Sequence, residues 1–143
     1  MKGPIQSLEV SYLVHSTEDP AKVNAAISEL VPFEGETEVE EMKGHYGNTI
    51  LRVRVRLFGD DAAGAFARIS QRLGEGLKKD LGRTISEHVD EHSALFLRFD
   101  KQKLVSGELS FADSEAVRIK VKPRAFLLRG TAHEFYAQLI GGD

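Results

Sequence analysis

The strongest constraint on the fold is a short stretch in which apolar and positively charged residues alternate. Residues 51–57 read Leu-Arg-Val-Arg-Val-Arg-Leu. Successive side chains of a β-strand point to opposite faces, so this pattern predicts a strand with one apolar face and one cationic face. Such a strand belongs in a sheet that is covered on one side and open on the other.

The same alternation recurs at 117–122, where Arg118, Lys120 and Lys122 take the polar positions. Period-two patterns at 8–14 and 95–99 predict two further strands, and 104–111 is interpreted as another, shorter one. The acidic segment 37–42 and the strand 50–58 flank a glycine-containing turn, which predicts a hairpin.

Helical spacing of apolar residues accounts for the rest of the chain. Pro20 is expected to begin one helix, and Gly59 a second, whose apolar stripe extends to 89 with interruptions at Gly74 and Gly76. A final helix is expected from about Thr131, at capping-box spacing. This order predicts the α+β class, with an antiparallel or mixed sheet and helices packed on one face.

Length and composition exclude several classes of protein. The 143 residues are expected to form a single domain over 1–143. The absence of cysteine rules out disulfides, thiolate metal sites and cysteine nucleophiles. No apolar run reaches the ~18 residues of a membrane span, and residues 1–4 lead directly into the first strand pattern without a signal sequence. A cytoplasmic location and no membrane association are therefore expected.

Positive charge is unevenly distributed. The net charge is −3, but residues 1–49 hold three Lys and nine Asp or Glu, so the cations concentrate in the later part of the chain. Like charges side by side on a strand face lower stability, and neither cationic stripe contains an acid, which favours a bound polyanion over a merely solvated face. The cations expected on the open face are Arg52, Arg54, Arg56, Arg118, Lys120 and Lys122.

The turn at 44–48 carries His45, Tyr46 and Asn48 between two glycines. Glycine allows another backbone to approach closely, so these side chains could stack on or clamp a nucleotide. The alternative is an ordinary hairpin turn, in which Gly47 and Asn48 supply positive φ angles.

Motifs for metal or cofactor chemistry are weak. His88 and His92 have the i, i+4 spacing of metal ligands, but no third ligand can be named, and solvated histidines near a helix end are the favoured interpretation. The sequence contains no Gly-x-Ser-x-Gly elbow, Walker motif or dinucleotide fingerprint. No cofactor and no catalytic residues are therefore expected.

Four segments together resemble a family of small archaeal RNA-binding proteins labelled predicted exosome subunits: 14–19, 44–48, 97–102 and 117–121. The resemblance extends over nearly the whole chain. It implies the fold of the large-subunit ribosomal protein that binds 5S RNA, and RNA binding in the archaeal cytoplasm. It brings no catalytic residues with it.

The sequence thus predicts a non-enzymatic RNA-binding domain that holds phosphates on the open sheet face, with Arg98, Lys101 and Lys103 extending the footprint. RNA is the expected partner, with an exosome- or ribosome-related assembly as a further one. Two alternatives stay open: a protein-interaction module that docks on an acidic partner, and a small hydrolase that uses His45.

Overall fold

The structure is a computed structural model that describes residues 4–125 and 128–141. It consists of a sheet with helices on one side. Along the chain the elements are β1 (Ile5–His15), α1 (Pro20–Leu30), β2 (Glu36–Lys43), β3 (Thr49–Phe58), α2 (Gly59–Thr84), the 3-10 turn η1 (Ile85–Glu87), β4 (Leu95–Asp100), α3 (Lys101–Val105), β5 (Ala116–Pro123) and α4 (Arg129–Gly141).

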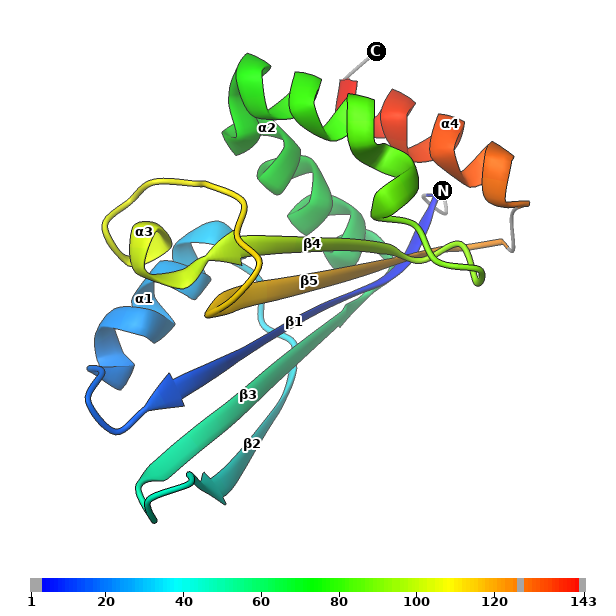
Figure 1. Cartoon of the computed structure of the whole chain (residues 1–143). Coiled ribbons are helices and arrows are strands. Elements are labelled where there is room, and N and C mark those ends of the chain that lie inside the picture. The colour runs from blue at the N-terminus through cyan, green and yellow to red at the C-terminus, as the bar shows by residue number, and fades with distance from the viewer. Residues whose placement is uncertain (1–3, 126–127, 142–143) are drawn as a thin grey trace.

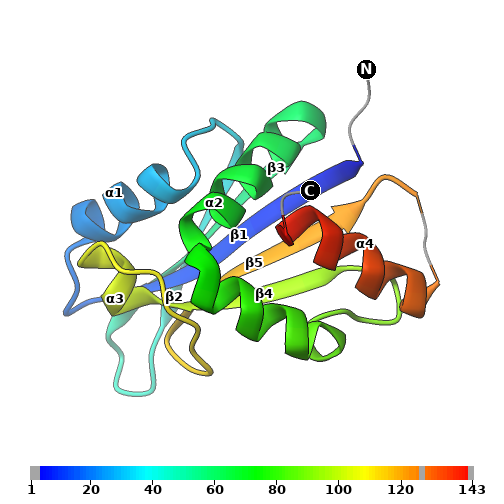
Figure 2. The ribbon, with the colours of Figure 1, turned by 90° about the horizontal axis from the view of Figure 1, so that it is seen from above.

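The five strands lie in the order β2-β3-β1-β5-β4, and every neighbouring pair is antiparallel (Figure 1). The helices all lie on one side of this sheet, with α4 above β4 and β5 (Figures 1 and 2). The opposite side carries no helix of the described chain. The predicted α+β class, with helices on one face, is confirmed.

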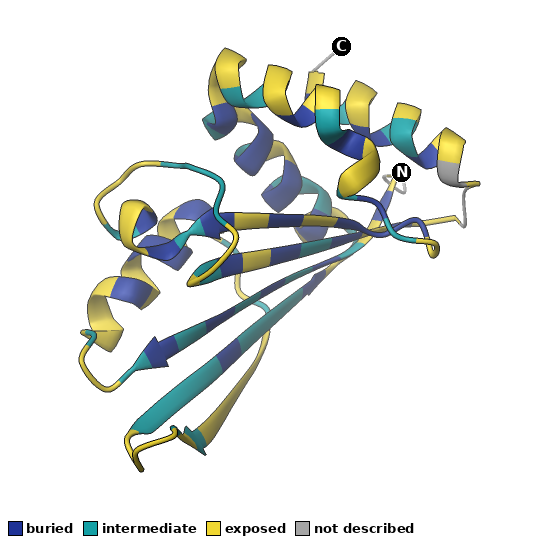
Figure 3. Ribbon diagram, in the orientation of Figure 1, coloured by how far each residue is buried: buried dark blue, intermediate teal, exposed yellow. Residues whose placement is uncertain are grey.

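Burial follows the alternation of the strands, as the banded colouring of Figure 3 shows. In β5, Val117, Ile119 and Val121 are fully buried against the helices, whereas Arg118 and Lys122 are exposed on the opposite face. β1 has the same pattern, with buried Val10 at its centre. The core thus lies between the helices and the apolar face of the sheet.

The helices cover the sheet unevenly. Of the apolar β3 residues that alternation directs toward the helices, Val53 and Leu57 are buried, whereas Leu51 and Val55 are half-buried. β2 and the adjoining end of β3 extend beyond the helical layer (Figure 1). The prediction that the apolar face of this strand is covered along its length was therefore wrong at Leu51 and Val55.

The long second helix bends where glycine predicted an interruption. Gly74 has a φ of 74°, a left-handed conformation that glycine adopts without a Cβ clash. The helix ends at Thr84 rather than extending to 89, because η1 follows and Val89 instead bridges Leu95 as an extended residue.

The segment after β4 differs from the expected strand over 104–111. The Asp100 side chain accepts a hydrogen bond of 2.9 Å from the Lys103 N–H and caps α3, so the chain turns into a helix. Only Phe111 returns to the sheet, as an isolated bridge to Phe99. The last helix begins at Arg129, two residues before the predicted cap. None of the helices in the described ranges is long and apolar enough to cross a membrane.

Candidate nucleic-acid interface

The pairing register brings the two cationic stripes to the open face, on either side of β1. Ser11 is paired with Arg54 on one side and Arg118 on the other. Glu9 is likewise flanked by Arg56 and Lys120. Because directly paired residues of a sheet share a face, all these side chains project to the side opposite the helices.

The β3 arginines are paired with carboxylates of the protein itself. Glu9 lies between two of them: its Oε1 is 3.3 Å from Arg54 Nε and its Oε2 is 3.1 Å from Arg56 Nε. Glu38 of β2 adds longer contacts to the same two guanidinium groups, at 3.8 and 3.9 Å. The charge of this stripe is therefore largely compensated inside the sheet.

The third β3 arginine is also paired with a carboxylate of the protein. Arg52 Nη2 donates to Glu40 Oε2 at 2.9 Å, and the register of the hairpin places Glu36, Glu38 and Glu40 opposite the arginine stripe. The expectation that a bound anion would be needed to relieve repulsion was wrong for this strand, because neighbouring strands supply the acids.

The cations of β4 and β5 differ from those of β3. Arg98 and Arg118 are exposed and directly opposite each other, so two positive charges share one cross-strand pair. Within the described part of the chain, no carboxylate comes within the 4.0 Å ion-pair distance of Arg98, Arg118, Lys120 or Lys122. Such a pair is destabilising in the free protein and suits an anionic ligand. We call these four residues the β4–β5 cation cluster.

The β2–β3 turn lies at the far corner of the sheet from β4 (Figure 1). Gly47 has a φ of 80°, and the Gly44 N–H bonds to the Asn48 carbonyl at 2.6 Å. A Cβ on Gly44 would lie 2.5 Å from Asn48 Oδ1, so Asn48 packs against the turn that it closes. Tyr46 is 91% exposed and meets His45 edge to face.

Lys101 does not extend the open face. Its side chain is 2% exposed, and its ammonium donates to the Leu13 carbonyl and to Glu18 Oε1, both at 2.8 Å. Gln102 Nε2 bonds to the other oxygen of Glu18 at 2.7 Å. Two of the segments that carry the family resemblance therefore meet here in a structural contact, and Lys101 drops out of the interface.

Glu18 is held as a carboxylate by this contact. Partial burial raises its pKa, but the hydrogen bond from Lys101, the bond from the His15 N–H and the charges of Lys101 and His15 lower it more, so its pKa lies below the ordinary 4.5. Lys103, two residues further along the same short helix, is exposed. Since α3 packs against α1 on the helical side, Lys103 also lies away from the open face.

The two candidate metal histidines are not on one helix face. His88 follows η1, where its Nδ1 is 3.1 Å from the Phe96 carbonyl, and His92 is exposed in the following turn. Among the residues that the structure describes, no group of three or more His, Cys, Asp or Glu could hold a metal ion.

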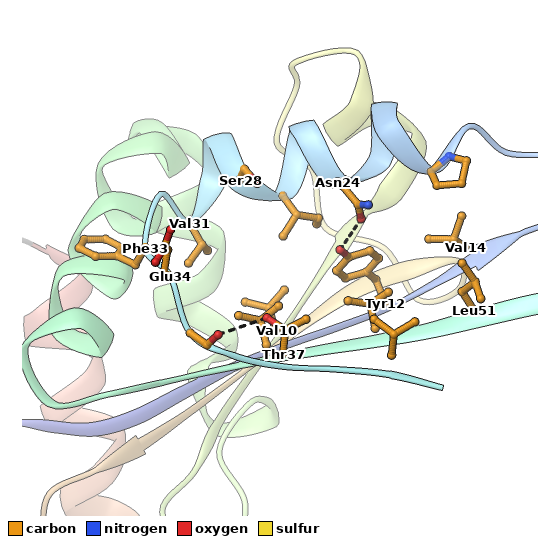
Figure 4. A pocket seen from close by; sticks show the side chains of 16 residues that line it. Val10, Tyr12, Val14, Asn24, Ser28, Val31, Phe33, Glu34, Thr37 and Leu51 are labelled. Atoms are coloured by element: carbon orange, nitrogen blue, oxygen red, sulfur yellow. Dashed lines mark hydrogen bonds between the residues drawn. The ribbon is translucent and has the colours of Figure 1, made fainter. Parts of the chain in front are cut away.

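An apolar groove opens on the helical side, where the helices leave β2 and β3 uncovered (Figure 4). It has a volume of about 520 Å³ and lies between α1 and the sheet, with Val10, Tyr12 and Leu51 in its floor and Phe33 at one end. The Tyr12 hydroxyl donates to Asn24 Oδ1 of α1 at 2.7 Å, and burial raises the pKa of this tyrosine. The groove is separated from the β4–β5 cation cluster by the sheet itself.

Both the sequence and the fold are similar to those of known proteins. The model of a family described as RNA binding matches residues 7–123. The chain belongs to this RNA-binding family. The curated RNA-binding protein PAB1135 of Pyrococcus abyssi is 31% identical over 148 residues, covering 92% of each chain.

Two solved structures from archaea share the fold. Protein AF2318 of Archaeoglobus fulgidus is 34% identical, with a TM-score of 0.79 over 94% of this chain and 99% of that one. Mth689 of Methanothermobacter thermautotrophicus, described as a DUF54 protein, is 28% identical, with a TM-score of 0.78 over 96% and 99%. The similarity thus extends over the whole sheet and its helices.

Proposed function

We propose that this protein binds RNA without catalysing a reaction on it, and that it holds the phosphate backbone on the β4–β5 half of the open face. The observation that carries the proposal is the β4–β5 cation cluster: Arg98, Arg118 and Lys122 are exposed and Lys120 is half-buried, and none has a carboxylate within ion-pair distance in the described part of the chain. Positive groups of this kind bind phosphates and release condensed counterions. The family description and the name of the Pyrococcus relative support the same ligand.

The arginines of β3 form a second row of the proposed interface. Arg52, Arg54 and Arg56 are half-buried and ion-paired, so each must exchange a carboxylate for a phosphate to take part. A phosphate that replaces a carboxylate gains less binding free energy than one that binds an unpaired cation. His45, Tyr46 and Asn48 lie at the end of this row and are proposed to contact RNA that crosses the whole sheet.

The cellular role is a further part of the proposal. We infer, from the motif resemblance alone, that binding serves RNA processing in the cytoplasm, in association with an exosome or a ribosome-related assembly. A likeness to the ribosomal 5S-RNA-binding protein belongs with this inference, and the helix-covered antiparallel sheet is consistent with it.

A salt series tests the proposal. Binding of a single-stranded RNA should weaken with salt, with a slope of about −3 in log K against log salt if four phosphates are contacted at ~0.7 each. Poly-glutamate of equal charge, measured in parallel, represents an acidic protein partner. A flat salt response for RNA, or binding of poly-glutamate with equal affinity, would contradict the proposal.

Removing one acid from the open face should strengthen RNA binding. Glu9 lies between Arg54 and Arg56 and opposite Lys120, so Glu9→Gln leaves these two guanidinium groups only their longer contacts to Glu38 and makes them more available to phosphates. We expect about a fivefold gain in affinity at ~0.1 M salt, the equivalent of one added phosphate contact. Glu29→Gln on the exposed surface of α1 is the control. Unchanged or weaker binding by Glu9→Gln would argue that phosphates do not reach these strands.

Tyr46→Ala tests the β2–β3 turn. The side chain is almost fully exposed, so the melting temperature should stay the same. If its ring stacks on a base, single-stranded RNA that crosses the sheet should lose roughly 1–3 kcal/mol of binding free energy, and a continuous duplex less. A lower melting temperature with a normal dissociation constant would assign the turn a purely architectural role.

A further inference from the structure

Phe96 is an apolar side chain on the polar face of the sheet. In β4, Leu95, Leu97 and Phe99 are buried toward the helices, and this alternation turns Phe96 to the open face, where it is 37% exposed. Its cross-strand partner is Lys120, whose Nζ lies 5.5 Å from the ring centroid. A large aromatic ring is thus displayed within the β4–β5 cation cluster.

A hollow of about 560 Å³ lies beside this ring, along the outer edge of β4. Its walls are formed by Phe96 and Arg98 of β4, by His88 before the strand and by Phe111 of the loop that follows α3, with carboxylates of Glu87 and Asp113 in its lining. Hollows of a few hundred Å³ accommodate small planar ligands. A nucleobase needs less room than this.

The aromatic wall of the hollow is held in place by contacts within the protein. His88 Nδ1 is 3.1 Å from the Phe96 carbonyl; because a carbonyl only accepts, this nitrogen is the donor, which fixes the ring. Phe111 stacks on buried Phe99 with a centroid distance of 5.3 Å and an interplanar angle of 16°. These contacts hold His88 and Phe111 in place beside the hollow.

We propose that this hollow receives one unpaired nucleobase of the bound RNA, stacked on Phe96, while Arg98 and Lys120 hold the flanking phosphates. The inference rests on the proposed RNA-binding function and names its substrate class as single-stranded RNA. Aromatic side chains bind unpaired bases of any sequence through their π-faces, and bases inside a duplex are not available to them. The carboxylates of Glu87 and Asp113 can accept hydrogen bonds from exocyclic amino groups.

Two variants at one position separate stacking from structural effects. Phe96→Ala should weaken binding of single-stranded RNA by roughly 5- to 150-fold, the range for loss of one stacked base. Phe96→Tyr keeps the ring and should bind within about twofold of the wild type. Leu128→Ala, which truncates another exposed apolar residue just before α4, is the matched control and should change nothing.

The measurement is the dissociation constant for a single-stranded oligonucleotide and for a duplex of the same length, together with 2-aminopurine fluorescence from a base placed in the single strand. Wild-type protein should quench this fluorescence, and Phe96→Ala should abolish the quenching. If the wild type binds RNA but Phe96→Ala binds the single strand equally well, or loses duplex binding to the same extent, the base site is wrong while the proposed function stands. If the wild type binds neither RNA, the proposed function itself fails.

Discussion

Replacing Arg98, Arg118 and Lys120 together by glutamine should reduce the affinity for single-stranded RNA by about 100-fold at ~0.1 M salt. Each phosphate contact with a single strand adds ~0.7 to the slope of log K against log salt. The loss of three contacts therefore lowers the affinity by about two powers of ten at ~0.1 M salt, which is one power of ten below 1 M. The slope itself should become shallower by about 2. Filter binding at several salt concentrations measures both quantities.

The control for this variant changes the same amount of charge elsewhere. Lys22, Lys79 and Lys103 are exposed on α1, α2 and α3, on the helical side of the sheet. Their combined replacement by glutamine should lower affinity only through long-range electrostatics, by less than about fivefold at this salt. An equal loss in both triple variants would mean that overall charge, rather than the β4–β5 cation cluster, determines binding.

Lys101→Met should lower the free energy of unfolding by about 3–5 kcal/mol, the usual effect of breaking a buried ion pair. The reason is that Glu18 and the Leu13 carbonyl both lose the Lys101 ammonium, while Met fills a similar volume. Urea unfolding monitored by circular dichroism measures the difference. Lys103→Met on the same helix is exposed and should stay within about 0.5 kcal/mol of the wild type.

The same pair predicts a pH dependence. The pKa of Glu18 is lower in the folded protein than its ordinary 4.5, so its contribution to stability is present above pH 4.5 and is lost as pH falls through the folded pKa. In Lys101→Met the Glu18 carboxylate has no ammonium partner, so its protonation removes an unpaired negative charge and lessens the destabilisation. The stability difference between variant and wild type should therefore shrink below pH 4.5, and a constant difference would contradict the role given to Glu18.

The sequence predicted the two faces of the sheet but not their charge balance. Alternation alone assigns Arg54 and Lys120 to polar faces, and their presence on the same face follows from the observed register. The hairpin contained a usable signal, because Glu38 and Glu40 alternate in step with the arginines across the turn. The role of Glu9 could not be foreseen, since it requires knowing that β1 lies between β3 and β5.

The surroundings of two site residues could not be predicted from the neighbouring sequence. Lys101 looked like part of a basic surface, but its burial depends on Glu18, 83 positions earlier in the chain. The alternation of β4 identifies Phe96 as an outward-facing aromatic residue. Its proposed role in binding a base, however, depends on Lys120 and on the hollow that Phe111 helps to form. Such partners are set by tertiary contacts that no short pattern encodes.

The most direct test of the proposed interface is an NMR titration of the labelled protein with a single-stranded RNA. We expect the largest chemical-shift changes in β4 and β5, around Phe96, Arg98, Arg118 and Lys120, and smaller ones in β3. The exposed surfaces of α1, α2 and α4 should be unaffected. Shifts concentrated on those helices or in the apolar groove beside α1, with β4 and β5 unchanged, would contradict it.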